Sequence, residues 1–197
     1  MFARTERLLL RPGWHEDAPA LAAAIGEEAI VRNLATAPWP YRLQDAESFL
    51  AREQGADGTS FLLLRRTGGA PKLVGAVGFG ATPDGEVELG YWIARPYWGL
   101  GYATEGAQAV IDIARDSLRL PRLVAGHFLD NPASARVLAK LGFNPTGRVR
   151  PRFSAGRGTA AMCRELSLDF GGSEGGAEDL EAACAQRSAF NFAVMAA

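Results

Sequence analysis

The chain has 197 residues, a formal net charge of -1 and 48% hydrophobic residues. This length favours one compact domain with a full core, and the balanced charge gives no electrostatic reason to expect a nucleic-acid partner. Cys163 and Cys184 make no disulfide framework, and His15 and His127 lack ligand-type spacing, so we expect neither structural disulfides nor a metal site.

The first half of the chain predicts strands and helices around one central strand. We expect a strand over 7–11, helices over 17–34 and 44–53, and strands over 61–66 and 72–79. The segment 73–79 is apolar on both faces, which is typical of a strand covered on both sides.

The second half alternates more regularly. We expect strands over 87–94, 122–129 and 161–170, with helices over 103–118 and 132–141 between them. This order predicts an α/β fold, a mixed sheet with helices on both faces.

The two ends of the chain give weaker signals. No apolar run is long enough for a signal peptide or a membrane span, so we expect a cytoplasmic protein without membrane contact. Residues 171–176 are glycine-rich and predict a linker after a 1–170 domain. Residues 179–195 have the pattern of a short helix; a disordered extension, a docked helix and a regulatory element all remain open.

Gly99 and Gly101 lie where the 87–94 strand turns into a helix. The first N–H groups of a helix lack internal partners and carry the positive end of the helix dipole, so they form an anion site, usually for phosphate. The alternative is an ordinary tight turn. Tyr102 and Ala103 replace the Lys-Ser/Thr pair of a Walker loop, and Thr104 replaces the third small residue of a dinucleotide fingerprint.

A second motif follows the 122–129 strand. Asn131 suits the cap of a helix, Pro132 its first position and Gly142 its end. Ser134 shares a helix face with Leu138 and other apolar residues, so its hydroxyl is expected to point inward.

Together these motifs identify a family. The stretch from Tyr97 to Glu105, with Asn131-x-x-Ser134 and Lys140-Leu141-Gly142-Phe143, resembles the GNAT acetyltransferases, in particular the Rim-type branch that acetylates N-terminal amines of ribosomal proteins. The segments 5–11 and 38–41 also fit that branch. The resemblance covers about residues 5–170 and implies a mixed, mostly antiparallel central sheet. Two positions depart from many members: Pro96 replaces Gln or Arg, and Leu138 replaces Tyr.

The resemblance implies acetyl-CoA as co-substrate, with no metal. Backbone N–H groups around Ile93 and Ala94 would hold the acetyl carbonyl and the pantetheine arm, and Asn131 is either a cofactor contact or only a helix cap. The implied cofactor-binding residues are Ile93, Ala94, Trp98, Gly99, Leu100, Gly101, Tyr102, Ala103, Thr104, Asn131 and Phe143.

Two side chains are implied as catalytic. Glu88 shares a strand face with Gly90 and Trp92, and would act as general base, often through water; the alternative is a solvated strand residue. Ser134 would stabilise the leaving thiolate, or else only support the helix N-terminus. An α-amine has a reference pKa near 7.7–8.0, against about 10.4 for lysine, so Glu88 would deprotonate an α-amine more easily than a lysine side chain.

For the acceptor, we expect a protein or peptide N-terminal amine that reacts directly in a ternary complex. Trp39, Tyr41 and Tyr91 are the predicted substrate-binding residues, although such aromatic residues also anchor loops or cores. Two alternatives stay open: a small amine acceptor (an aminoglycoside, a polyamine or an amino acid), and a non-catalytic acyl-CoA-binding module. The protein is expected to be a monomer or a homodimer.

Four arginines gather late in the chain, in a stretch that is predicted to be rich in loops. A solvated surface loop is favoured there over contact with an anionic substrate or the nucleotide end of coenzyme A. These residues are Arg148, Arg150, Arg152 and Arg157.

Overall fold

The computed structural model describes residues 1–51 and 58–171. The end of the predicted 44–53 helix, nearly all of the 171–176 segment and the predicted 179–195 helix lie outside the described residues.

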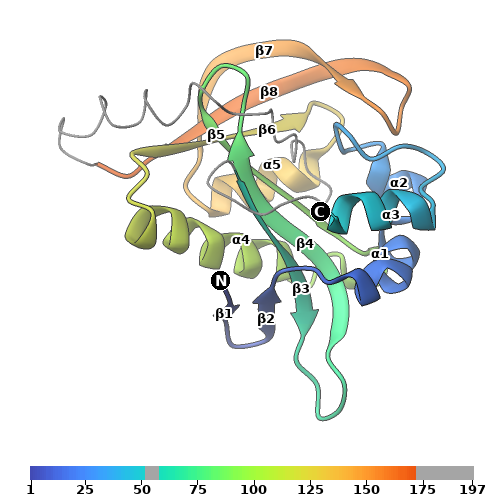
Figure 1. The fold of residues 1–197 in the computed structure, drawn as a ribbon. Coiled ribbons are helices and arrows are strands. Elements are labelled where there is room, and N and C mark those ends of the chain that lie inside the picture. Colours follow the sequence, from blue (N-terminus) through green and yellow to red (C-terminus); the bar gives the residue numbers. More distant parts are fainter. Residues whose placement is uncertain (52–57, 172–197) are drawn as a thin grey trace.

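The described strands form one eight-stranded sheet in the order β1-β2-β3-β4-β5-β6-β8-β7 (Figure 1). Neighbouring strands run antiparallel except for β5 and β6, which are parallel. The predicted mixed, mostly antiparallel α/β sheet is confirmed. The strands are β1 (Ala3–Arg4), β2 (Leu8–Arg11), β3 (Gly58–Arg65), β4 (Lys72–Ala81), β5 (Val87–Ile93), β6 (Arg122–Phe128), β7 (Asn144–Ser154) and β8 (Thr159–Asp169).

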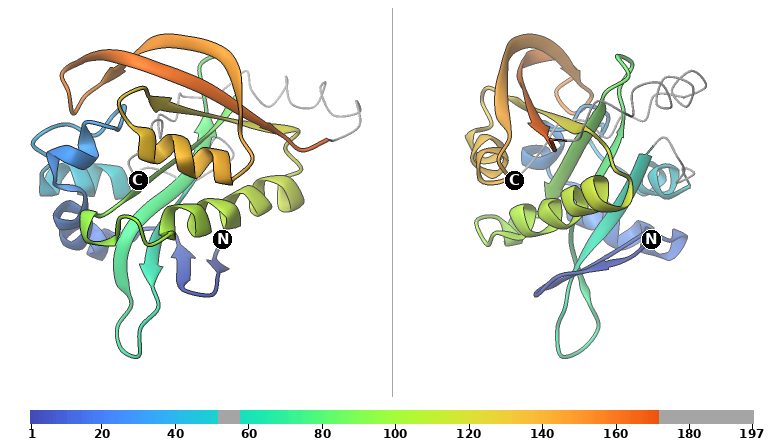
Figure 2. Two further views of the ribbon diagram at one scale, coloured as in Figure 1. Left: turned by 180° about the vertical axis from the view of Figure 1, so that it is seen from behind. Right: turned by 90° about the vertical axis from the view of Figure 1, so that its left-hand side faces the viewer.

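Helices cover both faces of the sheet. The views in Figure 2 show α4 and α5 on one side and α1, α2 and α3 on the other. A 3₁₀ turn precedes α1, another follows β5, and a π-helical turn extends α4. The bounds are His15–Asp17, Arg95–Tyr97 and Ile113–Ser117 for these turns, and α1 (Ala18–Ile25), α2 (Glu28–Val31), α3 (Leu43–Leu50), α4 (Tyr102–Asp112) and α5 (Pro132–Lys140) for the helices.

Strand β5 divides two hydrophobic cores. Leu89, Tyr91 and Ile93 pack in the core beneath α4 and α5, whereas Trp92 packs in the core beneath α1 and α3. Side chains alternate across a strand, so Glu88 lies on the Trp92 face, as predicted. The same division makes β4 a strand buried on both faces.

The predicted 17–34 helix is wrong as one element, because it is broken in the middle. Gly26 leaves the helical conformation (φ -67°, ψ 39°) and ends α1, and α2 then starts at Glu28. The apolar residues keep helical spacing across Gly26, so periodicity alone does not reveal the break there.

The arginine-rich stretch was expected to be loop-rich, and this expectation is wrong. Arg148, Arg150 and Arg152 lie on β7, which pairs with β8 at the edge of the sheet. An edge strand tolerates prolines and charged side chains, so β7 lacks the apolar alternation that marks an inner strand. Strand β1 was also missed.

No helix among residues 1–51 and 58–171 is long and apolar enough to cross a membrane.

Candidate active site

The glycine loop precedes α4 as expected. Gly99 and Gly101 have φ values of 76° and 83°, a left-handed conformation that suits glycine, and Gly101 is the N-cap of α4. Within the described chain no side chain caps this helix, so its first N–H groups remain available to an anion.

A pocket of about 310 Å³ opens at this loop, between the start of α4 and the side of α5. Most of the predicted cofactor-binding residues line it. These are Ile93, Trp98, Gly99, Gly101, Tyr102, Ala103 and Thr104.

The other predicted cofactor residues do not line this pocket. The Ala94 N–H donates to the Val74 carbonyl at 2.8 Å, so it is already used in the sheet. Phe143 is buried in the core and Leu100 is exposed. Asn131 caps α5, where its Oδ1 accepts from the Ser134 N–H at 3.2 Å.

Trp98 links the loop to the end of β5. Its indole Nε1 donates to the Ile93 carbonyl at 2.6 Å, which fixes the ring beside the pocket. The Ile93 carbonyl therefore has a partner within the protein.

Two cations that sequence reasoning missed also line the pocket. Arg136 and Lys140 stand one turn apart on α5, together with Ala133 and Val137. Residues four apart share a helix face, so their spacing was visible in the sequence. Only the packing of α5 beside α4 turns that face toward the glycine loop.

Ser134 and Tyr91 meet beneath α5. Both residues are fully buried, and the Tyr91 hydroxyl lies 3.2 Å from Ser134 Oγ. Burial raises the pKa of Tyr91, so the phenol stays protonated. The structure thus places Tyr91 behind Ser134, inside the core, and not on an open acceptor wall.

Glu88 lies on the opposite face of β5, with its side chain only 8% exposed. Arg152 of β7 donates to both of its carboxylate oxygens, at 2.5 and 2.8 Å. Burial works against the charge of Arg152, but the hydrogen bonds and charge of Glu88 outweigh it and raise the pKa of the guanidinium. The carboxylate predicted as a base is therefore half of an ion pair.

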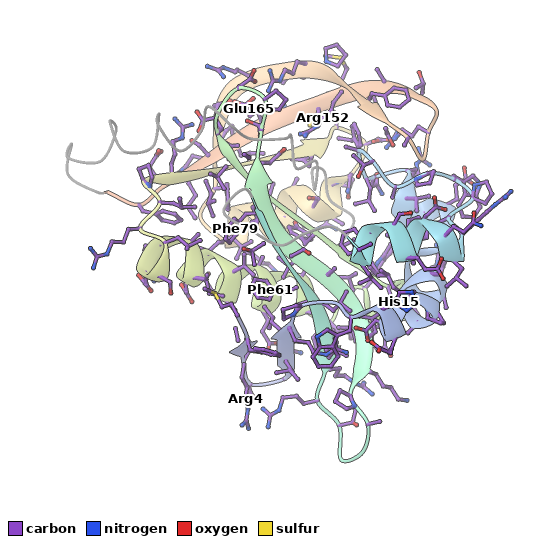
Figure 3. All side chains as sticks on the ribbon, viewed as in Figure 1. Arg4, His15, Phe61, Phe79, Arg152 and Glu165 are labelled. Atoms are coloured by element: carbon purple, nitrogen blue, oxygen red, sulfur yellow. The ribbon has the colours of Figure 1, made fainter. Side chains whose placement is uncertain are left out.

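The absence of a side chain at Gly126 of β6 gives this pair its room. A Cβ there would lie 2.9 Å from Cys163 Sγ, 3.4 Å from Arg152 Nη1 and 3.5 Å from Glu88 Oε1. Burial raises the pKa of the Cys163 thiol. Figure 3 shows Arg152 in the upper part of the sheet, with Glu165 nearby.

A second pocket, of about 550 Å³, surrounds Glu88 and Arg152. It lies between the turn at 82–86 and strands β6, β7 and β8, on the face of β5 opposite to Ile93. In the ladder between β5 and β6 the one registered pair is Glu88 with Val124, so Glu88 stands where these strands part.

Trp39 and Tyr41 line neither of these two pockets. Trp39 is 44% exposed and Tyr41 is half-buried, both just before α3. In the described residues no group of His, Cys, Asp and Glu side chains is arranged to hold a metal ion.

Comparisons with known proteins agree with this geometry. The family model described as an acetyltransferase (GNAT) domain matches residues 7–144. The Bacillus subtilis (strain 168) protein described as uncharacterized N-acetyltransferase YoaA is 32% identical over 158 residues, which are 74% of this chain and 84% of that protein.

Solved structures share the fold. A ribosomal-protein-S5-alanine acetyltransferase from Vibrio fischeri has a TM-score of 0.68 at 20% identity, over 87% of this chain and 97% of that one. RimL, a ribosomal L7/L12 alpha-N-protein acetyltransferase solved in complex with coenzyme A, has a TM-score of 0.72 at 16% identity, over 86% and 98%.

Proposed function

The chain belongs to the GNAT acetyltransferase family, and from this membership we propose that it transfers acetyl from acetyl-CoA to a primary amine, the N-terminal amine of a protein or peptide. The observation that carries the proposal is the pair of pockets on opposite faces of β5, one at the glycine loop and one around Glu88. Cofactor and acceptor can then approach the gap between β5 and β6 from opposite sides.

The residues of the smaller pocket suit coenzyme A. The N–H groups at the start of α4 would receive the pyrophosphate, and a Cβ at Gly99 would meet no described atom within 4 Å, so this side of the loop is open to a ligand. Arg136 and Lys140 add two positive charges on the α5 side.

The reaction itself needs a free amine and a stabilised leaving thiolate. The amine lone pair attacks the thioester carbonyl carbon, the C–N bond forms, and the C–S bond breaks to release coenzyme A. Glu88 takes the amine proton directly or through water, which requires the amine or water to share an oxygen with Arg152. Ser134 would donate to the thiolate, whose protonated form has a reference pKa of about 8.5. Its hydroxyl is buried beside Tyr91 and lines neither described pocket, so this donation requires α5 to shift when the cofactor binds.

The acceptor class is supported by the fold neighbours whose names describe action on ribosomal proteins. An α-amine is also the easier acceptor, since a large fraction of it is uncharged near neutral pH.

Coenzyme A thiol release from acetyl-CoA tests the proposal. The acceptors are short peptides starting with Ser, Ala, Thr or Asp, beside a panel of small amines that includes free amino acids. We expect release with the peptides. Release with small amines alone would show that the acceptor is a small amine and not a peptide N-terminus. No release with any acceptor would contradict the proposed acetyl transfer.

Variants of two neighbouring carboxylates sharpen the test. Glu88→Gln should lower turnover strongly while coenzyme A binding is retained, because Glu88 lies on the acceptor side. Glu86→Gln is the matched control, since Glu86 lines the same pocket but pairs with Arg122, and it should have the smaller effect. Unchanged kinetics in Glu88→Gln would remove this residue from the mechanism.

A further inference from the structure

The larger pocket contains a cation where an amine should react. The guanidinium of Arg152 donates to both oxygens of Glu88, and the Arg152 side chain is 26% exposed. Because Arg152 neutralises the Glu88 carboxylate, this carboxylate attracts an approaching ammonium group less than an unpaired one would.

The other carboxylates of this pocket are also paired. Glu165 lies 3.2 Å from Arg150 and 3.4 Å from Arg148, and Arg150 also lies 3.4 Å from Asp84. Glu86 pairs with Arg122 at 3.4 Å. Among the described residues that line the pocket, no carboxylate is left without an arginine partner.

A bare ammonium group would therefore have to share a carboxylate with an arginine or displace that arginine. If it displaced Arg152 from Glu88, a largely buried guanidinium would lose its partner, which is costly. An acceptor that brings both an ammonium and a carboxylate would exchange both partners at once. Its amine would bind Glu88 while its carboxylate bound Arg152, and no buried charge would be left alone.

We infer that the acceptor carries a carboxylate within a few bonds of its reacting amine, and that Arg152 binds this carboxylate. The inference rests on the proposed acetyl transfer and selects among its acceptors; a free amino acid would also replace the proposed peptide acceptor. The short Glu88–Arg152 contact sets the spacing, because both acceptor groups must reach atoms that now touch. A free amino acid and a peptide that begins with Asp or Glu both present this chemistry.

Matched pairs of acceptors distinguish a free amino acid from a peptide that begins with an acidic residue. One pair is a peptide starting with Asp and its Asn counterpart, and the other is a free amino acid and its amide. We expect the carboxylate member of at least one pair to have a kcat/KM about tenfold higher or more, the usual effect of one charge-assisted contact. The pair that shows the preference identifies the source.

Arginine variants then test the residue. Arg152→Gln should bring the ratio within the preferred pair close to one, and Arg152→Lys should keep part of it. Arg164→Gln is the matched control, because it removes the same charge from an exposed position of β8 that does not line the pocket, and it should leave the ratio unchanged.

The outcomes are distinct from those of the proposed function. Equal or better use of both neutral members by the wild-type protein overturns this inference and leaves the transferase standing. A preference that survives Arg152→Gln overturns the role of Arg152. If Arg152→Gln does not fold, the kcat/KM ratio within the preferred pair, measured for the wild type and for Arg152→Lys, decides whether Arg152 binds the carboxylate. No release with any acceptor overturns the proposed function, and this inference with it.

Discussion

Arg7 and Glu105 join the start of the chain to the first turn of α4 through an ion pair of 2.6 Å. The Arg7 guanidinium also donates to the Leu100 carbonyl at 2.9 Å, and its backbone N–H donates to Glu105 at 2.9 Å. The ring of Tyr102 lies under the same guanidinium, 4.6 Å away. Arg7 thus ties the glycine loop to the first turn of α4, and it does not line the pocket.

We therefore predict that Arg7→Gln raises the KM for acetyl-CoA about tenfold, since a charge-assisted contact contributes about that much and the loop loses two supports. The KM for the acceptor should change much less. Steady-state kinetics with each substrate varied measures the difference, and Arg4→Gln, an exposed change on β1, is the control. A fall in kcat without a change in either KM would contradict a positioning role.

Acid should weaken the same contact. Burial alone would raise the pKa of Glu105, but hydrogen bonds from Thr5 and Arg7 outweigh it and hold the pKa below its usual value of about 4.3. A lowered folded pKa stabilises the protein above the unfolded pKa, and this contribution is lost as pH falls through the folded value. Thermal unfolding between pH 7 and 3 should show a smaller acid-induced drop in Tm for Glu105→Gln than for wild type. Equal drops would assign the acid sensitivity to other groups.

The Tyr91–Ser134 contact allows a test of the predicted thiolate donor. Ser134→Ala should lower kcat on the order of 10²-fold. Tyr91→Phe removes only the hydroxyl behind Ser134 and should cost far less, because Ser134 Oγ remains. Single-turnover rates measure both. Equal losses would indicate that the buried hydrogen bond matters and not donation to the thiolate.

The two cations on α5 should act on the cofactor alone. Arg136→Gln and Lys140→Gln should each weaken coenzyme A binding about three- to tenfold at low salt, and less at high salt, where exposed charges are screened. Titration calorimetry at two salt concentrations measures this. Lys72→Gln, at the start of β4 and outside both pockets, should have no effect. Unchanged binding in both α5 variants would separate them from the cofactor.

A side chain at Gly126 should destabilise the protein, because there is little space for it beside Cys163. Gly126→Ala places a methyl group 2.9 Å from Cys163 Sγ, and we expect a loss of about 1–3 kcal/mol in the free energy of unfolding. Cys163→Ala removes that sulfur, so the double variant should be more stable than the sum of the single changes predicts. Denaturant unfolding of the four proteins gives the coupling. Simple additivity would show that another contact opposes the methyl group.

Part of the site was predictable because it depends on neighbours in the chain. The glycines of 99–101 lie between a strand and a helix, the Asn131 cap precedes Pro132, and alternation along β5 separates Glu88 from Leu89. Each is a local rule of backbone geometry, and the structure shows all three. The family resemblance, carried by the same motifs, is confirmed.

Contacts between distant segments were not predictable in this way. Arg152 reaches Glu88 across 64 residues and Arg7 reaches Glu105 across 98. Strand order alone does not predict either contact, since two strands separate β7 from β5 and Glu105 lies on α4 outside the sheet. Strand β7 itself forms at the sheet edge by pairing with β8, although its own pattern is that of a loop. The sequence alone determined where the glycine loop, the strand before it and the helix after it lie. The tertiary structure decided which charges meet around them, because a periodic pattern gives the face of an element but not its neighbour.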